Sequence, residues 1–172
     1  NNSDTAEIFF DVKVSEDALV GELNKGFYYL MDNLNAGRIQ FAAWNYGFSL
    51  GLFKETLKYV NDRETFGKKL SGNQYIQFDL ARLRSKLELV KVYKQHAATN
   101  LTRESASICK NEAAALAEEM AKQCRHWHGG YSCTMEYHVG RFASDCYVSE
   151  LGEGSREVNW MVIWKELEKN YL

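Results

Sequence analysis

The sequence predicts an all-α fold, an antiparallel four-helix bundle preceded by a short extended segment. Three observations support this prediction: long apolar stripes at helical spacing, short polar connections between them, and the absence of proline from the 172 residues. Average usage near 5% would give about nine prolines in such a chain, so their absence argues against a loop-rich β architecture. Because a domain has roughly 100–200 residues, the chain is expected to form one.

The first residues have a different pattern from the rest. Residues 8–14 read Ile-Phe-Phe-Asp-Val-Lys-Val, which is typical of a β-strand. The sequence also begins without Met and without the character of a signal or transit peptide. We therefore expect residues 1–20 to be the last strand and linker of a preceding β-domain in a longer protein, and residues 21–172 to form the helical bundle domain.

A long first helix is predicted over roughly residues 24–61, because after Gly21 the apolar period changes from two to about 3.6. The residues expected on its inward stripe are Phe27, Leu30, Met31, Leu34, Phe41, Ala42, Asn45, Ser49, Phe53, Leu57 and Val60.

Further helices follow at short intervals. The second begins after a turn bracketed by Gly67 and Gly72 and ends near residue 100. The third follows a polar connection over residues 102–105 and ends at Gly129 and Gly130, because glycine adopts positive φ without strain. Two shorter helices are predicted over residues 136–149 and 156–170. Helices of these lengths with short connections pack most readily antiparallel, as a bundle.

Composition excludes several classes of function. The formal net charge is −2 with scattered Lys and Arg, which argues against a nucleic acid or an anionic membrane as partner. The longest uncharged stretch, residues 39–53, is too short and too polar for a membrane span. The four cysteines form no Cys-x-x-Cys pair, so a reducing compartment such as the cytoplasm or the mitochondrial matrix is expected.

Residues 150–158 hold the most informative pattern for chemistry. Glu153 stands between Gly152 and Gly154, just before a predicted helix. A ligand can approach a glycine-flanked backbone closely, and a helix start offers unpaired N–H groups. By spacing alone, an exposed loop with Ser155 as helix cap and Glu157 in the first turn is the better explanation, because serine caps and acidic first-turn residues are common.

Five ordered motifs, taken together, resemble the C-terminal helical domain of acyl-CoA dehydrogenases over essentially the whole chain. Glu-Gly-Ser-x-Glu at 153–157 resembles the family's Glu-Gly-Thr/Ser segment. Asn-x-x-Arg at 35–38, Arg-x-x-Phe-Gly at 63–67 and Gln-x-x-x-Phe at 74–78 resemble three earlier family signatures. His-Gly-Gly-Tyr at 128–131, with Glu136, Tyr137 and Arg141, resembles the family's Gly-Gly turn and Glu-Tyr-x-x-x-Arg run.

The resemblance implies dehydrogenation of an acyl-CoA thioester between its α and β carbons. It assigns Glu153 as the base that removes the α-proton, while hydride leaves the β carbon for FAD. Some members carry the base immediately before the conserved arginine, but that position here is Gly37. The substrate-binding residues that the resemblance implies are Leu34, Asn35, Arg38 and Gly154. The alternative interpretation of Arg38 is an ordinary salt bridge within or between helices, of the kind that surface arginines often form.

The resemblance also implies an FAD site shared between subunits. The residues it assigns to a neighbouring subunit's FAD are Arg63, Thr65, Phe66, Gln74, His126, Gly129 and Gly130, and those assigned to the subunit's own FAD are Ser155 and Glu157. Such sharing implies a homotetramer or homodimer, with an electron-transfer flavoprotein as a possible electron acceptor. In this sequence His126 replaces a common Gln, Asn35 a common Asp, and Gly152 the aromatic residue that commonly borders the acyl pocket.

Other functions compete with this one. An acyl-CoA oxidase would use the same scaffold, whereas nitroalkane oxidases carry Asp in place of Glu153. A zinc site at Cys124, His126 and His128 lacks the ligand spacing for tetrahedral coordination, and we expect no metal. A non-catalytic helical oligomerisation module could use the tryptophans as interface, although such side chains are more often core: Trp44, Trp127, Trp160 and Trp164.

Overall fold

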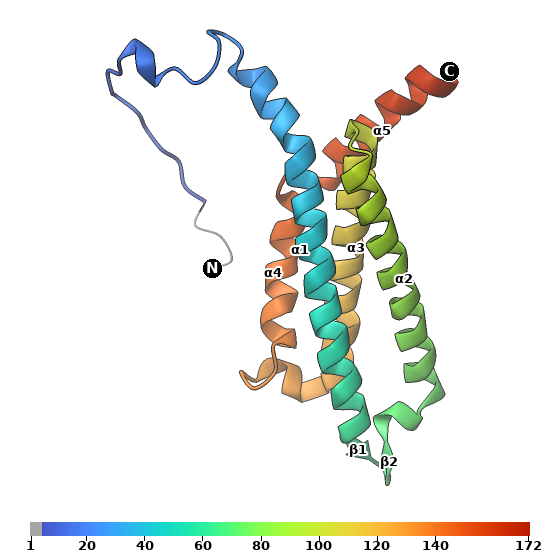
Figure 1. Cartoon of the computed structure of the whole chain (residues 1–172). Helices are drawn as coiled ribbons and strands as arrows, with labels where there is room; N and C mark the ends of the chain where they lie inside the picture. Colours follow the sequence, from blue (N-terminus) through green and yellow to red (C-terminus); the bar gives the residue numbers. More distant parts are fainter. Residues whose placement is uncertain (1–4) are drawn as a thin grey trace.

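The computed structural model describes residues 5–172. Residues 1–4, which belong to the segment expected to come from a preceding β-domain, lie outside the described residues. Four helices stand side by side and a fifth crosses one end (Figure 1). Their bounds are α1 Gly26–Asp62, α2 Gln74–Thr99, α3 Arg103–His128, α4 Val139–Leu151 and α5 Arg156–Tyr171. Each lies within about three residues of the predicted ranges, which confirms the predicted all-α bundle.

Successive helices run antiparallel, and α3 lies at the centre of the packing. It contacts α1, α2, α4 and α5, whereas α2 packs mainly along α1 and α3 (Figure 1). This order places the α4–α5 loop beside the first half of α1, and the α1–α2 and α3–α4 connections at the opposite end of the bundle (Figure 1). Two separate groups of predicted site residues therefore lie at opposite ends.

The core is a continuous column between α1, α2 and α3, and α4 adds Val139 and Cys146 to it. Buried apolar side chains follow the predicted helical spacing on each helix, and α3 adds a row of alanines that lets α1 approach closely. The largest fully buried apolar residues are Leu52, Val60, Leu83, Leu87, Met120 and Val139. Three polar residues of α1 are also buried: Asn45, Ser49 and Thr56. The apolar spacing of the first helix predicts the burial of Asn45 and Ser49 but not that of Thr56.

Local capping decides where the helices begin and end. Residues 103–105, predicted as part of a connection, instead form the first turn of α3, because Thr102 and Ser105 make a reciprocal capping box. Gly129 ends that helix with φ of 56°, as predicted. Asn73 caps α2 by accepting a hydrogen bond from the N–H of Tyr75 at 3.0 Å.

A small hairpin joins α1 to α2. Strand β1, Glu64–Thr65, pairs antiparallel with β2, Lys68–Lys69, and the short 3-10 helix η2, Leu70–Gly72, leads into α2. The two turn residues, Phe66 and Gly67, have φ of 51° and 75°. Positive φ at both positions matches the right-handed twist of a two-residue hairpin.

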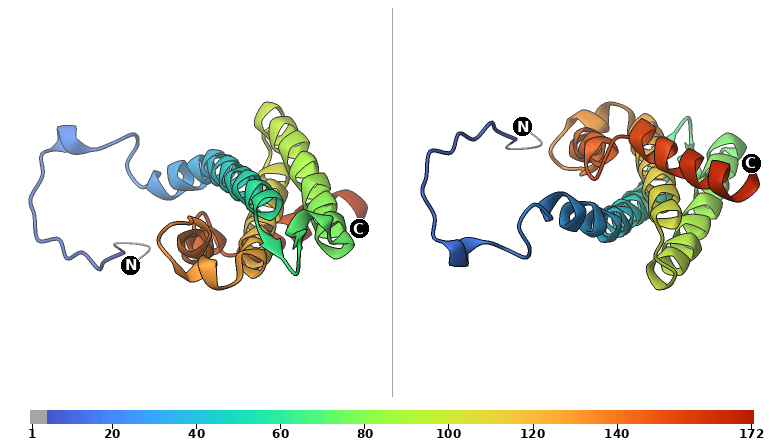
Figure 2. Two further views of the ribbon diagram at one scale, coloured as in Figure 1. Left: turned by 90° about the horizontal axis from the view of Figure 1, so that it is seen from below. Right: turned by 90° about the horizontal axis from the view of Figure 1, so that it is seen from above.

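The strand predicted over residues 8–14 is wrong for this structure. Residues 5–15 form no strand, and the short 3-10 helix η1, Glu16–Ala18, is the only regular element described before α1. Both end-on views show this segment as a wide loop to one side of the helices (Figure 2). The reason is physical: no described strand lies beside it to take up its N–H and C=O groups, and its side chains are exposed.

Some apolar residues predicted as core are exposed. Phe27 and Leu30, at the beginning of the α1 stripe, extend beyond the helices that could cover them, and Leu57 is also exposed. Of the tryptophans, Trp127 is 7% exposed, whereas the other three, Trp44, Trp160 and Trp164, are 47–54% exposed. None of the described helices is both long and apolar enough to cross a membrane.

Candidate functional site

Glu153 lies in the tight loop between α4 and α5. Its φ is 58° and that of Gly154 is 95°, so two consecutive residues adopt the left-handed region. That region is unfavourable for a non-glycine residue and is found where the surroundings enforce it. The loop therefore presents the Glu153 side chain in a direction that an ordinary helix connection would not.

The Glu153 carboxylate lies directly against α1 at Gly37. A Cβ atom added to Gly37 would come within 2.5 Å of Oε2 of Glu153, so only glycine leaves room for the carboxylate there. Residues 37 and 153 are thus neighbours in space, although they are far apart in the chain: Glu153 comes 115 positions after Arg38, the residue that follows Gly37. The two positions at which the resemblance allows a base meet at one point.

Arg38 ties α1 to the loop. Its Nε donates to the backbone carbonyl of Glu153 at 3.3 Å, and its Nη1 donates to Oδ1 of Asn35 at 3.2 Å. The side chain is 6% exposed, so it is not the surface salt-bridge residue of the alternative interpretation. Burial lowers the pKa of the guanidinium, and the charge of Glu153 acts in the opposite direction.

Gly152 makes room for an aromatic side chain from α1. A Cβ atom at residue 152 would come within 2.4 Å of the Phe41 ring. The φ of Gly152 is −62°, so it is space and not backbone conformation that favours glycine here. Leu34 and Asn35, the other predicted substrate-binding residues of α1, are half-buried on the same stretch of helix.

Three polar side chains that the sequence analysis did not single out hold the loop from within the bundle. Lys110 of α3 is fully buried and donates from Nζ to the carbonyls of Glu150 and Gly154, at 2.7 and 2.9 Å. Asn159 of α5 also donates to the Gly154 carbonyl, at 2.9 Å, and Asn111 donates to that of Arg156 at 3.0 Å. One feature of the sequence could have identified Lys110: it is a charged residue on the face of the third helix that otherwise carries small side chains such as Ala106, Ala113 and Ala114.

Ser155 and Glu157 occupy the beginning of α5. Ser155 is its N-cap, and its Oγ accepts a hydrogen bond from the N–H of Val158 at 3.4 Å, as predicted. Glu157 is exposed in the first turn, where hydrogen bonds from its own backbone N–H and from Ser155 lower its pKa. Neither residue contacts the opposite end of the bundle.

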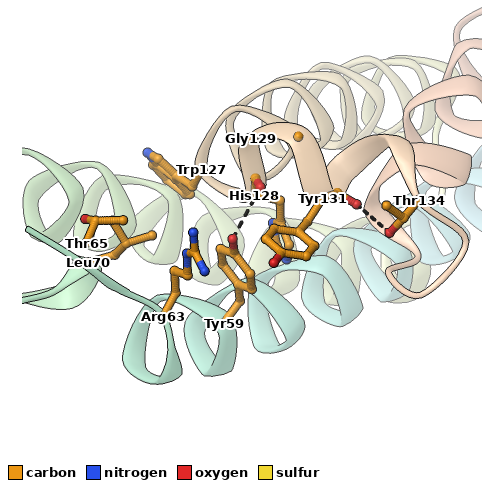
Figure 3. A pocket seen from close by; sticks show the side chains of 10 residues that line it. Tyr59, Arg63, Thr65, Leu70, Trp127, His128, Gly129, Tyr131 and Thr134 are labelled. Atoms are coloured by element: carbon orange, nitrogen blue, oxygen red, sulfur yellow. Dashed lines mark hydrogen bonds between the residues drawn. The ribbon is translucent and has the colours of Figure 1, made fainter.

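A second site lies at that opposite end, where α1 and α3 finish. A pocket of about 520 Å³ is lined by residues of both helices and of the short 3-10 helix η3, Gly129–Cys133 (Figure 3). Tyr59 stacks on His128 with ring centroids 4.1 Å apart and donates its hydroxyl proton to the His128 carbonyl at 3.3 Å. The guanidinium of Arg63 lies 5.4 Å from the centre of the Tyr131 ring.

The residues of this pocket fit an anionic nucleotide group. Arg63 is an exposed cation, Tyr131 and Trp127 offer aromatic surfaces, and a Cβ atom at Gly129 or Gly130 would meet nothing within 4 Å. The Nε1 of Trp127 is buried and has no hydrogen-bond partner in the part of the chain that the structure describes.

The remaining predicted cofactor residues surround this end. Thr65 lines the same pocket and, with Phe66, a smaller hollow along the hairpin, where the Phe66 side chain is fully exposed. His126 lies beside Lys122 and Arg125 in an adjacent hollow of about 670 Å³. Gln74 is exposed at the first position of α2.

One chain does not bring the two groups of predicted residues together. Gly37 and Arg63 are separated by the length of α1 between them, which at 1.5 Å per residue is about 39 Å. A dinucleotide is too short to contact Glu153 and Arg63 of the same chain. This separation agrees with the shared cofactor site that the resemblance implies.

The cysteines and histidines near the second site do not converge. Nδ1 of His128 lies 2.8 Å from the carbonyl of Cys124, whereas His126 is exposed in the neighbouring hollow. Within residues 5–172 no group of three or more His, Cys, Asp or Glu side chains is arranged to hold a metal ion. Burial raises the pKa of the Cys124 thiol to about 12, which leaves it protonated and a poor ligand at neutral pH.

Comparison with known proteins gives one consistent family. The model of the acyl-CoA dehydrogenase C-terminal domain matches residues 24–168. Subunit CarC of the caffeyl-CoA reductase–Etf complex of Acetobacterium woodii is 37% identical over 91% of the chain, and the mitochondrial long-chain specific acyl-CoA dehydrogenase of Sus scrofa is 35% identical over 95%.

The structural comparison agrees with the sequence comparison. The butyryl-CoA dehydrogenase of Megasphaera elsdenii superimposes with a TM-score of 0.89 at 31% identity, over 94% of this chain and 43% of that one. The chain likewise spans 42% of CarC and 40% of the porcine enzyme, so it corresponds to less than half of each relative.

Proposed function

The chain belongs to the acyl-CoA dehydrogenase family, as its C-terminal domain, and from this we propose that the protein containing it removes hydrogen from the α and β carbons of an acyl-CoA thioester, using FAD and Glu153 as base. The observation that carries the proposal is the contact between Glu153 and Gly37. It joins, in one place, the two positions at which family members hold their base.

The proposed role of Glu153 follows from its surroundings. An α-proton beside a thioester is a weak acid, so the base must be fixed in place and the developing enolate oxygen must be stabilised. The loop supplies the first requirement, since Arg38 and Lys110 hold the carbonyls of residues 150, 153 and 154. By family resemblance, the backbone N–H of Glu153 supplies part of the second.

Substrate binding is proposed for the adjoining part of α1. Arg38 is already bonded to the loop through Nε and to Asn35 through Nη1, so its remaining N–H groups are the ones proposed to meet the CoA moiety. Leu34 and Asn35 would line the same approach. Phe41 lies where a side chain at residue 152 would be, and we propose that its ring takes over the wall of the acyl pocket.

FAD is proposed as the cofactor, and its bound flavin would supply the hydride acceptor. The residues proposed to hold its diphosphate and adenosine are those of the second site, above all Arg63 and Thr65 with Gly129 and Gly130. They would come from a neighbouring subunit, whereas Ser155 and Glu157 would contact the FAD of their own subunit. A homotetramer or homodimer follows from this arrangement, since one chain cannot complete the site.

Reduction of an α,β-unsaturated acyl-CoA is a second candidate, because a 37% identical relative is named a caffeyl-CoA reductase subunit. The same residues would serve it in reverse: protonated Glu153 would give its proton to the α carbon while hydride arrives at the β carbon. That relative is also named as part of a complex with Etf, which favours an electron-transfer flavoprotein as the redox partner.

The test uses the full-length protein, purified with FAD and mixed without oxygen with saturated acyl-CoA thioesters of graded chain length. We expect the flavin absorbance to bleach, and the rate to fall by about 10²-fold or more in Glu153→Gln while FAD remains bound. A Gln variant that bleaches at the native rate would show that Glu153 is not the base. Rapid return of the flavin absorbance when an enoyl-CoA is added to chemically reduced protein, without bleaching by saturated acyl-CoA, would favour the reductase direction.

A further inference from the structure

Lys110 is the one lysine among the fully buried residues of the described chain. It lies in the first half of α3 and donates one hydrogen bond to the last turn of α4 and one to the Glu153 loop. We propose that Lys110 is a positioning residue, whose ammonium group fixes the loop in the conformation that aims the Glu153 carboxylate. The inference rests on the proposed function, because it assigns to Lys110 an effect on the proton that Glu153 removes.

The ammonium group has no other evident reason to be buried. Taking a cation out of water is unfavourable unless it is paired or hydrogen-bonded, and burial here lowers the pKa of Lys110, with Glu150 as the main opposing influence. The nearby carboxylate of Glu150 is itself paired with Arg156. Lys110 instead donates to two backbone carbonyls. Its buried ammonium group therefore fixes the conformation of the main chain between them.

These two carbonyls lie on either side of Glu153. Glu150 is in the last turn of α4, where carbonyls lack a partner within the helix and where a cation is favourable. Gly154 follows Glu153 directly. One ammonium group therefore joins the end of α4 to the far side of the loop, across the residues that turn.

The loop needs such a constraint. Glu153 has a φ of 58°, a conformation from which a non-glycine residue relaxes unless its neighbours hold it. Arg38 holds the intervening carbonyl of Glu153 from α1, and Asn159 adds a second donor to Gly154. Asn159 also donates to the carbonyl of Ser155, so both of its bonds lie after Glu153. Of these three side chains, Lys110 is the one whose two bonds span Glu153, so its removal breaks the link between the end of α4 and the far side of the turn.

A purely structural lysine would also stabilise the joint between α3, α4 and α5. The two roles differ in what they affect: a purely structural lysine changes stability alone, whereas a positioning residue also controls the rate of α-proton removal in the folded protein, with little change in substrate affinity. A misplacement of the base by about 1 Å lowers the rate by about 10²-fold.

The experiment isolates the proton step. The probe is an acyl-CoA analogue with sulfur in place of the β carbon, which has an acidic α-proton but no β-hydride to lose. Its α-protons exchange with D₂O on the full-length FAD-bound protein, and mass spectrometry follows that exchange. The variant is Lys110→Met, which keeps the length of the apolar stem, and the matched control is Lys86→Met, which removes an exposed lysine paired with Glu119.

We expect Lys110→Met to slow exchange by about 10-fold or more, with an analogue Kd within about threefold of the native value. Lys86→Met should behave as the native protein. A readout without substrate accompanies it: backbone amides of residues 150–155 should exchange hydrogen faster in Lys110→Met, while those of α2 should not change. Native α-proton exchange in folded Lys110→Met would overturn the inference.

Lys110→Gln keeps an NH₂ donor on a stem one bond shorter and serves as the partial rescue. Its exchange rate should lie between those of the Met variant and the native protein. If the Met variant does not fold, the Gln variant decides: slowing by threefold or more with native Kd supports the inference, and a native rate overturns it. Failure of the proposed function looks different, since native protein and Glu153→Gln would then exchange the α-proton equally.

Discussion

Gly37 is the residue on which the position of the Glu153 carboxylate depends most directly. We expect Gly37→Ala to displace the carboxylate, because the new Cβ would lie 2.5 Å from its Oε2. Since the displaced atoms are the end of a flexible side chain, stability should change by less than about 1 kcal/mol. Flavin bleaching by acyl-CoA should slow by about 10- to 100-fold, which stopped-flow absorbance of the full-length protein would measure.

Gly47→Ala is the matched control for this prediction. Gly47 lies in the same helix, and a Cβ atom there would meet nothing within 4 Å. Alanine should therefore stabilise the protein by about 0.5–1 kcal/mol through helix propensity and leave the bleaching rate unchanged. Equal rates in the two alanine variants would show that the contact with Gly37 does not position the base.

Gly152 and Phe41 form a second pair of residues whose sizes depend on each other. Gly152→Ala should lower the free energy of unfolding by about 1–3 kcal/mol, because its Cβ would lie 2.4 Å from the Phe41 ring. The loss should shrink in the Phe41→Leu background, giving a coupling energy of about 1 kcal/mol in a double-mutant cycle measured by urea denaturation. Additive effects of the two substitutions would contradict the packing described.

At the scale of elements, the capping box of α3 controls where the central helix begins. Thr102→Ala removes the acceptor of the Ser105 N–H hydrogen bond, 3.0 Å long, and should cost about 1 kcal/mol of unfolding free energy. The control is Thr99→Ala at the exposed end of α2. Its hydroxyl donates to nearby carbonyls and accepts from the Asn100 side-chain amide, and its loss should matter by less than about 0.5 kcal/mol. Urea denaturation of both variants makes the measurement.

The elements that could be predicted from sequence are those with local causes. Helical spacing predicts the long helices. The glycine pair at 129–130 predicts where α3 ends, and Ser155 predicts where α5 begins. The first turn of α3 was missed because a capping box and a polar connection have similar compositions. The strand over residues 8–14 failed because a strand depends on a partner, which no local pattern reports.

The site was predictable only in part for the same reason. The glycine-flanked Glu153 stood out because its pattern is contiguous, but its neighbours Gly37 and Lys110 come from two other helices. Their closeness depends on how α1, α3 and the α4–α5 loop pack, which spacing along the chain does not encode. Phe27 and Trp160 were expected in the core but are exposed. An apolar pattern identifies a surface that avoids water, but it does not distinguish a surface covered by the same chain from one covered by another.

At the scale of the whole molecule, the distance between the two sites predicts how subunits must cooperate. Glu153 lies beside Gly37 and Arg63 lies at the end of α1, about 39 Å further along that helix. If each complete site takes Glu153 from one subunit and Arg63 from another, a defect in either residue can be compensated by a partner that carries the other. A site within one chain would allow no such compensation.

We therefore expect two inactive variants of the full-length protein, Glu153→Gln and Arg63→Glu, to restore activity when they are co-expressed and assemble together. A site formed by the Glu153 of one subunit and the Arg63 of the other is intact only in mixed assemblies, so random pairing should restore about a quarter of the native sites. Acyl-CoA-dependent flavin bleaching measures the restored fraction. Mixing the separately purified variants without subunit exchange is the control and should restore nothing. If the co-expressed assemblies, shown to contain both chains, are as inactive as the parents, then Glu153 and Arg63 do not meet across subunits, and the second site at the end of α1 has another ligand.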